Sequence, residues 1–135
     1  MLRGASEVFE YPMIDRDPVP TWVDGRAALL GDAAHVMYPV GSNGASQSIL
    51  DARCLAGHLR TQDEIETALS RYDAERRPAT SEIVLANRRG GPEGVIDMVE
   101  ARAPDGFDDI DAVASFEERK AVVRGYASLA RGRNR

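Results

Sequence analysis

The chain has 135 residues, of which 43% are hydrophobic and 29% charged, and its formal net charge at pH 7 is −5. These values are typical of one small globular domain, and the acidic balance argues against a nucleic-acid binder, which needs a basic face to displace counterions from phosphates. The sequence offers neither an apolar signal core after Met1 nor a run of about twenty apolar residues to span a bilayer. We therefore expect a cytoplasmic protein with no membrane or nucleic-acid partner.

The first thirty residues carry two strand-like patterns. Apolar and polar residues alternate loosely from residue 7 to residue 21, where two prolines end the run. Asp24-Gly25 is typical of a turn, and residues 26–30 predict a short strand that is buried on both faces. Because a lone hairpin is marginal in water, these strands require a sheet that the chain does not obviously contain.

Helical periodicity dominates the rest of the chain. Apolar residues at helical spacing predict a first helix over residues 45–59, which Ser42 or Asn43 could cap. Thr61 and Glu64 form a capping-box pattern at the start of a second helix.

Proline and glycine divide the pattern that follows. We expect Pro78 to kink or end the second helix, because its ring clashes with the preceding turn and it lacks an N–H. A further helical piece should stop at residues 90–92, and the proline there is well placed to begin another short helix. Residues 103–106 predict a turn, and Ser115 with Glu118 predicts a cap for the last helix.

The expected fold class is therefore mainly α with one or two short strands. We divide the chain into residues 1–30 with the strands, residues 31–61 with a loop and the first helix, and residues 62–135 with the remaining helices. These regions are expected to form one compact unit.

The segment with the most unusual composition in the chain covers residues 29–47. Asp32 follows a short apolar run, the position at which open α/β sheets place ligand-binding groups. Its carboxylate could accept hydrogen bonds from sugar or polyol hydroxyls, or it could merely cap the turn that follows, and the spacing fits both. Gly41 and Gly44 permit close backbone approach, and free amides at residues 43–45 favour a partial negative charge. The segment predicts a site for a nucleotide-like cofactor.

Other chemistries fit these residues less well. His35 and Asp32 with a nearby serine suggest a hydrolase triad, but Ser46 and Ser48 lie in a predicted helix without a G-x-S-x-G elbow. Asp32, His35 and His58 lack the spacing of a metal motif, so we expect His35 to be structural and no metal to bind. No Gly-Lys-Ser/Thr follows the glycines, which excludes a Walker A loop.

The cysteine and the arginine pairs suggest structural roles. Cys54 is the only cysteine and lies within a helical pattern, so we interpret it as a small buried hydrophobe. The pairs Arg76-Arg77 and Arg88-Arg89 could bind an anion, but arginines near helix ends are usually solvated or locally paired.

Several stretches carry a family resemblance: Asp15 to Trp22, Gly25-Arg26, Leu29 to His35, Pro39 to Gln47, and Ala74 to Pro78. Together they resemble the C-terminal part of single-component, FAD-dependent aromatic-ring hydroxylases. Within these flavoprotein monooxygenases the similarity is to the branch that contains 5-methylphenazine-1-carboxylate monooxygenase and salicylate hydroxylase. It covers most of this chain but only the last third or so of such an enzyme.

The resemblance implies which residues contact FAD, and no catalytic residue is among them. The implied cofactor-binding residues are Gly31, Asp32, Pro39, Gly41, Asn43, Gly44 and Ala45. Asp32 would hydrogen-bond the ribityl chain, while the proline and glycines shape the loop beside the isoalloxazine ring. The helix start would point its amides at the pyrimidine end, where a helix N-terminus stabilises the anion of the reduced flavin.

The resemblance also implies that part of the site is missing. The family begins with a strand and G-x-G-x-x-G, which seats the pyrophosphate, and this chain has no such sequence. Residues 1–30 would then be a remnant of the substrate-binding sheet and the last strand of a Rossmann-like α/β cofactor domain. We expect the whole enzyme to hydroxylate an aromatic small molecule with NAD(P)H and O2.

The isolated chain is expected to be inactive, with an incomplete FAD site and a missing N-terminal partner portion. The alternative is a non-enzymatic helical module that self-associates, for example as a homodimer, or binds another protein.

Overall fold

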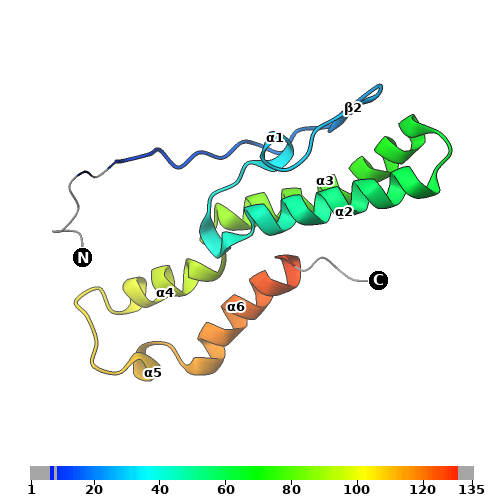
Figure 1. Cartoon of the computed structure of the whole chain (residues 1–135). Coiled ribbons are helices and arrows are strands. Elements are labelled where there is room, and N and C mark those ends of the chain that lie inside the picture. Colours follow the sequence, from blue (N-terminus) through cyan, green and yellow to red (C-terminus); the bar gives the residue numbers. More distant parts are fainter. Residues whose placement is uncertain (1–6, 8, 131–135) are drawn as a thin grey trace.

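The computed structural model describes residue 7 and residues 9–130, which form a mainly helical chain with one small hairpin of strands (Figure 1). The elements in chain order are β1 Val23–Asp24, β2 Ala27–Ala28, α1 Asp32–His35, the 3-10 helix η2 Val40–Ser42, α2 Gly44–Thr61, α3 Ile65–Asn87, the 3-10 helix η3 Gly91–Glu93, α4 Gly94–Arg102, α5 Ile110–Val113 and α6 Phe116–Ala130. The prediction of a mainly α chain with one or two short strands is confirmed. The division of the chain at residues 30 and 61 stays a prediction. None of the helices in the described part is long and apolar enough to cross a membrane.

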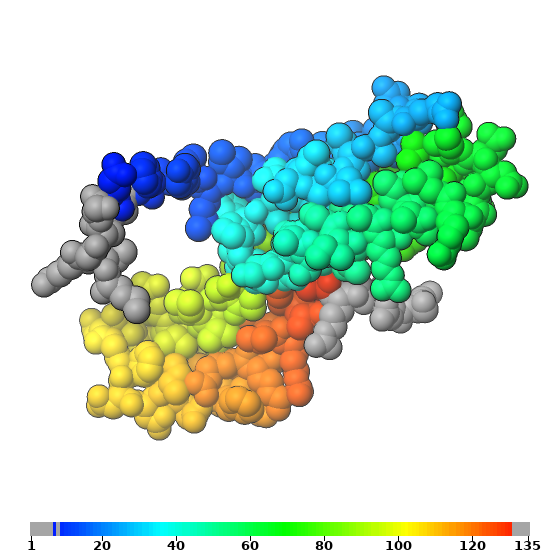
Figure 2. Space-filling model, viewed as in Figure 1, coloured from blue at the N-terminus to red at the C-terminus, as the bar shows by residue number. Residues whose placement is uncertain are grey.

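The two longest helices, α2 and α3, form an antiparallel hairpin that carries the core (Figure 1). The segment before them runs along one side of this hairpin, while α6 lies at an angle on the other side, and α4 to α6 form a separate layer (Figures 1 and 2). Trp22 is 3% exposed and lies with its ring centroid 5.7 Å from that of Tyr72 on α3. Its backbone N–H donates to the Asp73 carboxylate over 3.0 Å. Burial of these aromatic surfaces fixes the N-terminal segment to α3.

A second buried cluster joins the loop after α1 to the far half of α3. It consists of Met37, Ile83 and Val84, each less than 9% exposed. The two clusters occupy the inner face of α3, which explains why so long a helix is stable although its overall amphipathicity is weak.

The strand predicted for residues 7–21 is not formed in the described part of that segment, which runs as an extended chain without strand pairing. Its apolar side chains are exposed, Phe9, Tyr11, Met13 and Ile14 by 64% to 79%. A strand needs a partner for its backbone N–H and C=O groups, and none lies beside it in the described residues.

The hairpin at residues 23–28 confirms the predicted turn but corrects the predicted strand. Val23 pairs with Ala28 and Asp24 with Ala27, and Gly25 adopts the positive φ of 55° that the tight turn requires. Of residues 26–30, only Ala27–Ala28 form a strand, and they are exposed rather than buried on both faces. Within the described residues β1 and β2 form a two-stranded sheet, and no further strand pairs with them.

Pro78 does not end the second helix, so that part of the prediction was wrong, and the kink given as the alternative stays a prediction. Helix α3 continues from Ile65 to Asn87 through the proline. An internal proline costs about 3 kcal/mol, but the burial of Tyr72, Ile83 and Val84 on both sides of it outweighs that cost. Pro78 and Ala74, the residue four positions before it, are both exposed.

The predicted helix caps had mixed outcomes. Ser115 and Glu118 form the predicted capping box, in which the Ser115 N–H donates to Glu118 Oε2 over 2.8 Å and the Glu118 N–H donates to Ser115 Oγ over 3.3 Å. The box predicted at Thr61 and Glu64 is absent from the described contacts. Helix α2 extends through Thr61, whose hydroxyl donates instead to the Gly57 carbonyl over 3.0 Å. Side-chain back-bonding within the helix thus competes with capping.

Candidate functional site

Asp32 lies at the start of a short helix and not at the end of a strand. Strand β2 ends at Ala28, two leucines follow, and Asp32 is the first residue of α1. Its side chain is exposed, whereas Gly31 before it is buried. Gly31 has a φ of +60°, and a Cβ at this position would lie 2.9 Å from Ser48 Oγ on α2. Only glycine allows this close approach of the loop to α2.

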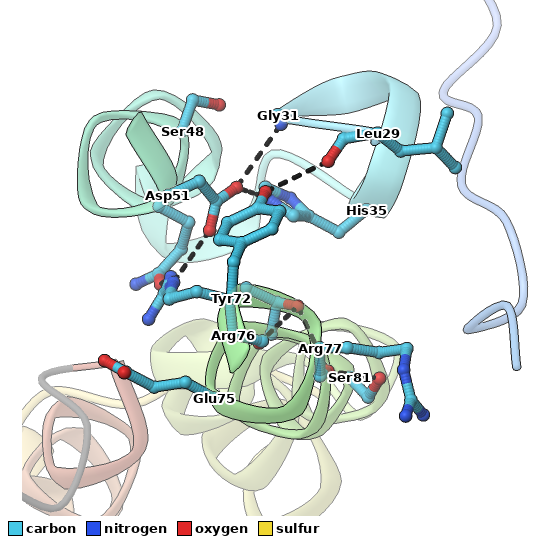
Figure 3. Close-up of polar contacts among 12 residues, drawn as sticks. Leu29, Gly31, His35, Ser48, Asp51, Tyr72, Glu75, Arg76, Arg77 and Ser81 are labelled. Carbon is cyan, nitrogen blue, oxygen red and sulfur yellow. Dashed lines mark hydrogen bonds and ion pairs between the residues drawn. The ribbon is translucent and has the colours of Figure 1, made fainter. Parts of the chain in front are cut away.

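A buried charged network holds this loop in place (Figure 3). The Asp51 carboxylate, fully buried on α2, accepts hydrogen bonds from His35 Nε2 at 2.5 Å and from Arg76 Nε at 2.7 Å. It also accepts the backbone N–H of Gly31 at 3.3 Å. Arg76 donates in turn to Gln47 Oε1 at 2.7 Å. One carboxylate therefore joins α1, α2 and α3.

The electrostatics of the network favour an ionised Asp51. Burial alone would raise the pKa of Asp51, but the hydrogen bonds and charges of His35 and Arg76 outweigh burial and lower that pKa. The nearby Tyr72 hydroxyl, which donates to the Leu29 carbonyl over 3.0 Å, has a raised pKa because of burial and the Asp51 charge. A buried carboxylate with several charge-assisted hydrogen bonds fixes the positions of its donors.

The N-terminal segment supports the same loop from its outer side. Arg16 donates to the carbonyls of Ala33 and Ala34 at 2.6 and 3.1 Å. Arg88, near the end of α3, forms ion pairs with both Asp15 and Asp17. These hydrogen bonds raise the pKa of Arg88. The Asp-Arg-Asp sequence thus connects α1 to the end of α3.

The glycine-rich loop before α2 lies against the C-terminal helix. Gly41 has a φ of +69°, and a Cβ there would lie 2.6 Å from the Tyr126 ring on α6. Asn43 is the residue before α2, yet its side chain forms no cap and donates instead to the Gly41 carbonyl and to Tyr126 Oη, both at 2.9 Å. Tyr126 donates to Asn87 Oδ1 at 2.7 Å, so α6 and α3 are joined through this loop.

The Gly41 N–H donates to the carboxylate of Glu93 at 3.0 Å. Both groups are at the surface end of the loop, where Glu93 is exposed. This backbone amide is therefore able to bind an anionic oxygen, in keeping with an amide-rich loop at a helix start.

The structure brings the two halves of the predicted site together. Ser48 lies beside Gly31 and its hydroxyl donates to the Gly44 carbonyl over 3.0 Å, so the Gly31-Asp32 segment and the first turn of α2 meet at this serine. Of the residues predicted to bind the cofactor, Gly31 and Asp32 lie on one side of this serine and Gly44 and Ala45, in the first turn of α2, on the other, while Pro39, Gly41 and Asn43 belong to the loop before α2. Among them Asp32, Pro39 and Ala45 are exposed. Their roles toward a cofactor stay predictions.

A cavity of about 320 Å³ lies between the loop and the last helix. Its lining consists of Gly41, Asn43, Pro92, Val123, Tyr126, Ala127 and Ala130. Two of the predicted residues, Gly41 and Asn43, therefore share a cavity with α6, which the sequence did not assign to the site.

Several residues of this region were missed by sequence reasoning. Gln47 and Asp51 are one turn apart on α2 and both buried, and Arg76 faces them from α3 with 8% exposure. We had interpreted Arg76 as a solvated or locally paired helix-end arginine, which was wrong, because it lies in the middle of α3 and pairs across the hairpin. Arg77 does pair locally, with Asp73 at 2.9 Å. His35 is buried, and its Nε2 is hydrogen-bonded to Asp51.

Comparison with known proteins agrees with this geometry. The family described as FAD binding domain matches residues 13–87, more than half of the chain. The chain belongs to this family of FAD-binding domains, as the resemblance to FAD-dependent aromatic hydroxylases had predicted.

Individual relatives are similar over part of their length. Phenazine 1,6-dicarboxylic acid hydroxylase PhzS of Lysobacter antibioticus is 59% identical over 88 residues, which are 65% of this chain and 22% of that protein. The 3-hydroxybenzoate 6-hydroxylase 1 of Aquipseudomonas alcaligenes is 45% identical over 78 residues, 58% of this chain and 20% of that protein.

Among solved structures, Klebsiella pneumoniae HpxO complexed with FAD and uric acid aligns with a TM-score of 0.64 and 28% identity. The alignment covers 86% of this chain and 28% of that one. The matches thus span only 20% to 28% of the length of these relatives.

Proposed function

We propose that the chain is part of an FAD-dependent monooxygenase that hydroxylates an aromatic substrate with NAD(P)H and O2. Its contribution would be the ribityl and isoalloxazine side of the FAD site. The observation that carries the proposal is the meeting of the Gly31-Asp32 segment with the first turn of α2 at Ser48. When bound, FAD supplies the redox chemistry of the reaction.

Asp32 has the central role in this proposal. Its carboxylate is exposed on a helix whose position is fixed from below by Asp51 and from the outside by Arg16. A fixed carboxylate is suited to accept hydrogen bonds from ribityl hydroxyls, at about 1.5 to 3 kcal/mol for each bond to a charged group. The Gly31 backbone would lie close to the same part of the cofactor.

The residues before and at the start of α2 would position the flavin ring. The backbone amides of residues 43–45 begin α2, and the N-terminus of an 18-residue helix favours negative charge. Pro39 and Gly41 would shape the surface beside the ring. The cavity next to Gly41 and Asn43, which is lined on one side by α6, is large enough for part of a ring system.

The remainder of the site would come from the portion of such an enzyme that this chain does not match. That portion would contain the rest of the Rossmann-like α/β domain, including the pyrophosphate loop, and most of the substrate-binding sheet. The exposed apolar side chains of Phe9, Tyr11, Met13 and Ile14 would then lie against it. We accordingly expect the isolated chain to be inactive.

The comparisons lend no support to the alternative of a non-enzymatic interaction module. Self-association as a homodimer would nonetheless cover the same apolar side chains when the partner portion is absent. Light scattering of the isolated chain would measure this directly, and a monomer at high concentration would exclude the homodimer.

A chimeric enzyme tests the proposal. Residues 13–87 of this chain would replace their equivalent in the Lysobacter antibioticus relative, with which the chain shares 59% identity. We expect the purified chimera to retain bound FAD and to oxidise NAD(P)H in the presence of an aromatic substrate. A folded chimera that retains no FAD would contradict the proposal.

A further inference from the structure

Three potential metal ligands converge from α2 and α3, apart from the residues assigned to FAD. Cys54 and His58 are four residues apart on α2 and therefore lie on one face of it, one turn from each other. Glu75 faces them from α3. One ligand atom from each of the three residues lies within 4.8 Å of the other two.

We propose that Cys54, His58 and Glu75 bind a zinc ion. The sequence predicted no metal site, because Asp32, His35 and His58 lack the spacing of a metal motif. Cys54, His58 and Glu75 are separated by up to 21 positions, and the helix hairpin brings them together. A thiolate, an imidazole and a carboxylate are the ligand types that zinc combines, whereas calcium and magnesium prefer oxygen ligands alone.

The geometry requires side-chain adjustment only. Zinc holds its ligands at about 2.0 to 2.3 Å, so its ligand atoms lie closer together than 4.8 Å. His58 Nε2 and Glu75 Oε2 are already 3.0 Å apart, and the Glu75 side chain is 62% exposed and free to adjust. Cys54, by contrast, is half-buried against the cluster of Trp22 and Tyr72 and provides a fixed point.

The charges at this position suit a divalent cation. A thiolate and a carboxylate with a neutral imidazole offset the two positive charges of zinc. Without a metal, burial and the neighbouring Glu75 raise the pKa of Cys54 to about 11, and the Asp51 charge acts in the same direction while Arg76 opposes it. Zinc would displace the thiol proton, so binding should release a proton and strengthen as the pH rises.

Three protein ligands leave the fourth tetrahedral position open to water. The ion would cross-link α2 to α3 one turn beyond Asp51, and the chain should therefore resist thermal unfolding better when zinc is added. Stabilisation by zinc needs neither FAD nor the remainder of an enzyme. A chain that zinc does not stabilise would therefore not contradict the proposed role in FAD binding.

Cobalt(II) provides the test, because a thiolate bound to it gives an intense charge-transfer absorption. The full chain, purified free of metal, would be titrated with Co²⁺ and then with Zn²⁺. Because Cys54 is the only cysteine, the band can arise only from this residue. We expect saturation at one Co²⁺ per chain, bleaching of the band by one Zn²⁺, and an increase in Tm on zinc binding.

Substitutions identify the ligands. Cys54→Ser should abolish the band, and Glu75→Gln should weaken zinc binding by at least about tenfold, since even partners outside the ligand shell affect metal affinity this much. Glu82→Gln, the same change at an exposed position on the same helix, should leave the affinity unchanged. If Cys54→Ser does not fold, His58→Gln, a change at a half-buried position, replaces it as the test of the ligands. We expect His58→Gln to weaken zinc binding by at least about tenfold as well.

Three results would overturn the proposal. One is the absence of the band in the wild-type chain at micromolar Co²⁺. Another is saturation at one Co²⁺ per two chains, which would indicate a cysteine pair between copies. The last is a zinc affinity that neither Glu75→Gln nor His58→Gln changes. In that case His58 and Glu75 form an ordinary ion pair and bind no metal.

Discussion

The backbone N–H of Gly31 donates a hydrogen bond to the buried Asp51 carboxylate, 3.3 Å away and 20 residues later in the chain. The segment that carries Asp32 is thereby attached to α2, and through Arg76 to α3. A loop proposed to hold FAD is thus positioned by a charged network beneath it, and the position of Asp32 should depend on residues that themselves need not touch the cofactor.

Asp51→Asn should destabilise the chain strongly. The substitution leaves Arg76 buried without its anion, and breaking a buried ion pair by changing one partner costs about 3 to 5 kcal/mol. Urea unfolding followed by circular dichroism would measure the loss. Asp63→Asn, at an exposed position in the turn between α2 and α3, is the control and should change the free energy of unfolding by less than about 0.5 kcal/mol. Equal stabilities of the two variants would contradict the described network.

The contribution of Asp51 should disappear in acid. Because its pKa in the folded chain lies below the ordinary value of 3.8, the unfolded chain takes up this proton first as the pH falls. The stabilisation is therefore complete above pH 3.8 and is lost as the pH falls through the folded-state pKa. The difference in unfolding free energy between wild type and Asp51→Asn should be constant near neutral pH and narrow below pH 3.8. A difference that grows in acid would refute this assignment of charge.

Gly41→Ala and Gly44→Ala should differ in their effects on stability. At Gly41 the positive φ and the Tyr126 ring at 2.6 Å leave no space for a Cβ, so we expect a loss of about 1 to 3 kcal/mol. At Gly44 nothing lies within 4 Å of the added Cβ, so alanine at the start of α2 should be neutral or stabilising by up to about 1 kcal/mol. Thermal unfolding of both variants would compare them.

The Gly44→Ala variant also distinguishes an effect on stability from an effect on FAD binding. If Gly44 allows close approach of FAD, Gly44→Ala should weaken FAD binding in the chimera although it leaves the chain stable. Unchanged FAD affinity in a stable Gly44→Ala chimera would remove Gly44 from the proposed site.

Cys54 should react slowly with alkylating reagents in the absence of metal. Burial and Glu75 raise its pKa to about 11, so little thiolate is present at neutral pH. Glu75→Gln removes a negative charge beside the thiol and should lower the pKa, which accelerates alkylation at pH 8. The rate of iodoacetamide modification across pH 7 to 11, measured with a chelator present, would reveal both pKa values. A rate profile that Glu75→Gln does not shift would mean that this carboxylate does not act on Cys54.

Local patterns were sufficient for the features that depend on neighbouring residues. The Asp24-Gly25 turn and the Ser115–Glu118 capping box follow from short-range hydrogen bonding and formed as predicted. The helical periodicity of α2 was equally clear. The resemblance of the glycine-rich segment to FAD-dependent hydroxylases was confirmed at the level of the family.

Features that depend on distant residues were not predictable. Pro78 is tolerated because side chains of α3 are buried on either side of it. This burial depends on packing against distant residues, so the sequence around Pro78 does not reveal it. Asp51 and Arg76 are 25 positions apart, and polar residues on a helix are usually expected to face water. The strand predicted before Pro18 lacks a partner in the described chain, so its alternating pattern had nothing to pair with.

The FAD affinity of the chimera with Asp32→Ala tests the central claim most directly. If Asp32 hydrogen-bonds the ribityl chain, its loss should weaken FAD binding by about one to two orders of magnitude, as expected for a bond of about 1.5 to 3 kcal/mol. Asp63→Ala in the same chimera should bind FAD as the unsubstituted chimera does. Equal FAD affinity of the Asp32→Ala and Asp63→Ala chimeras, with both folded, would contradict the assignment of this loop to the cofactor.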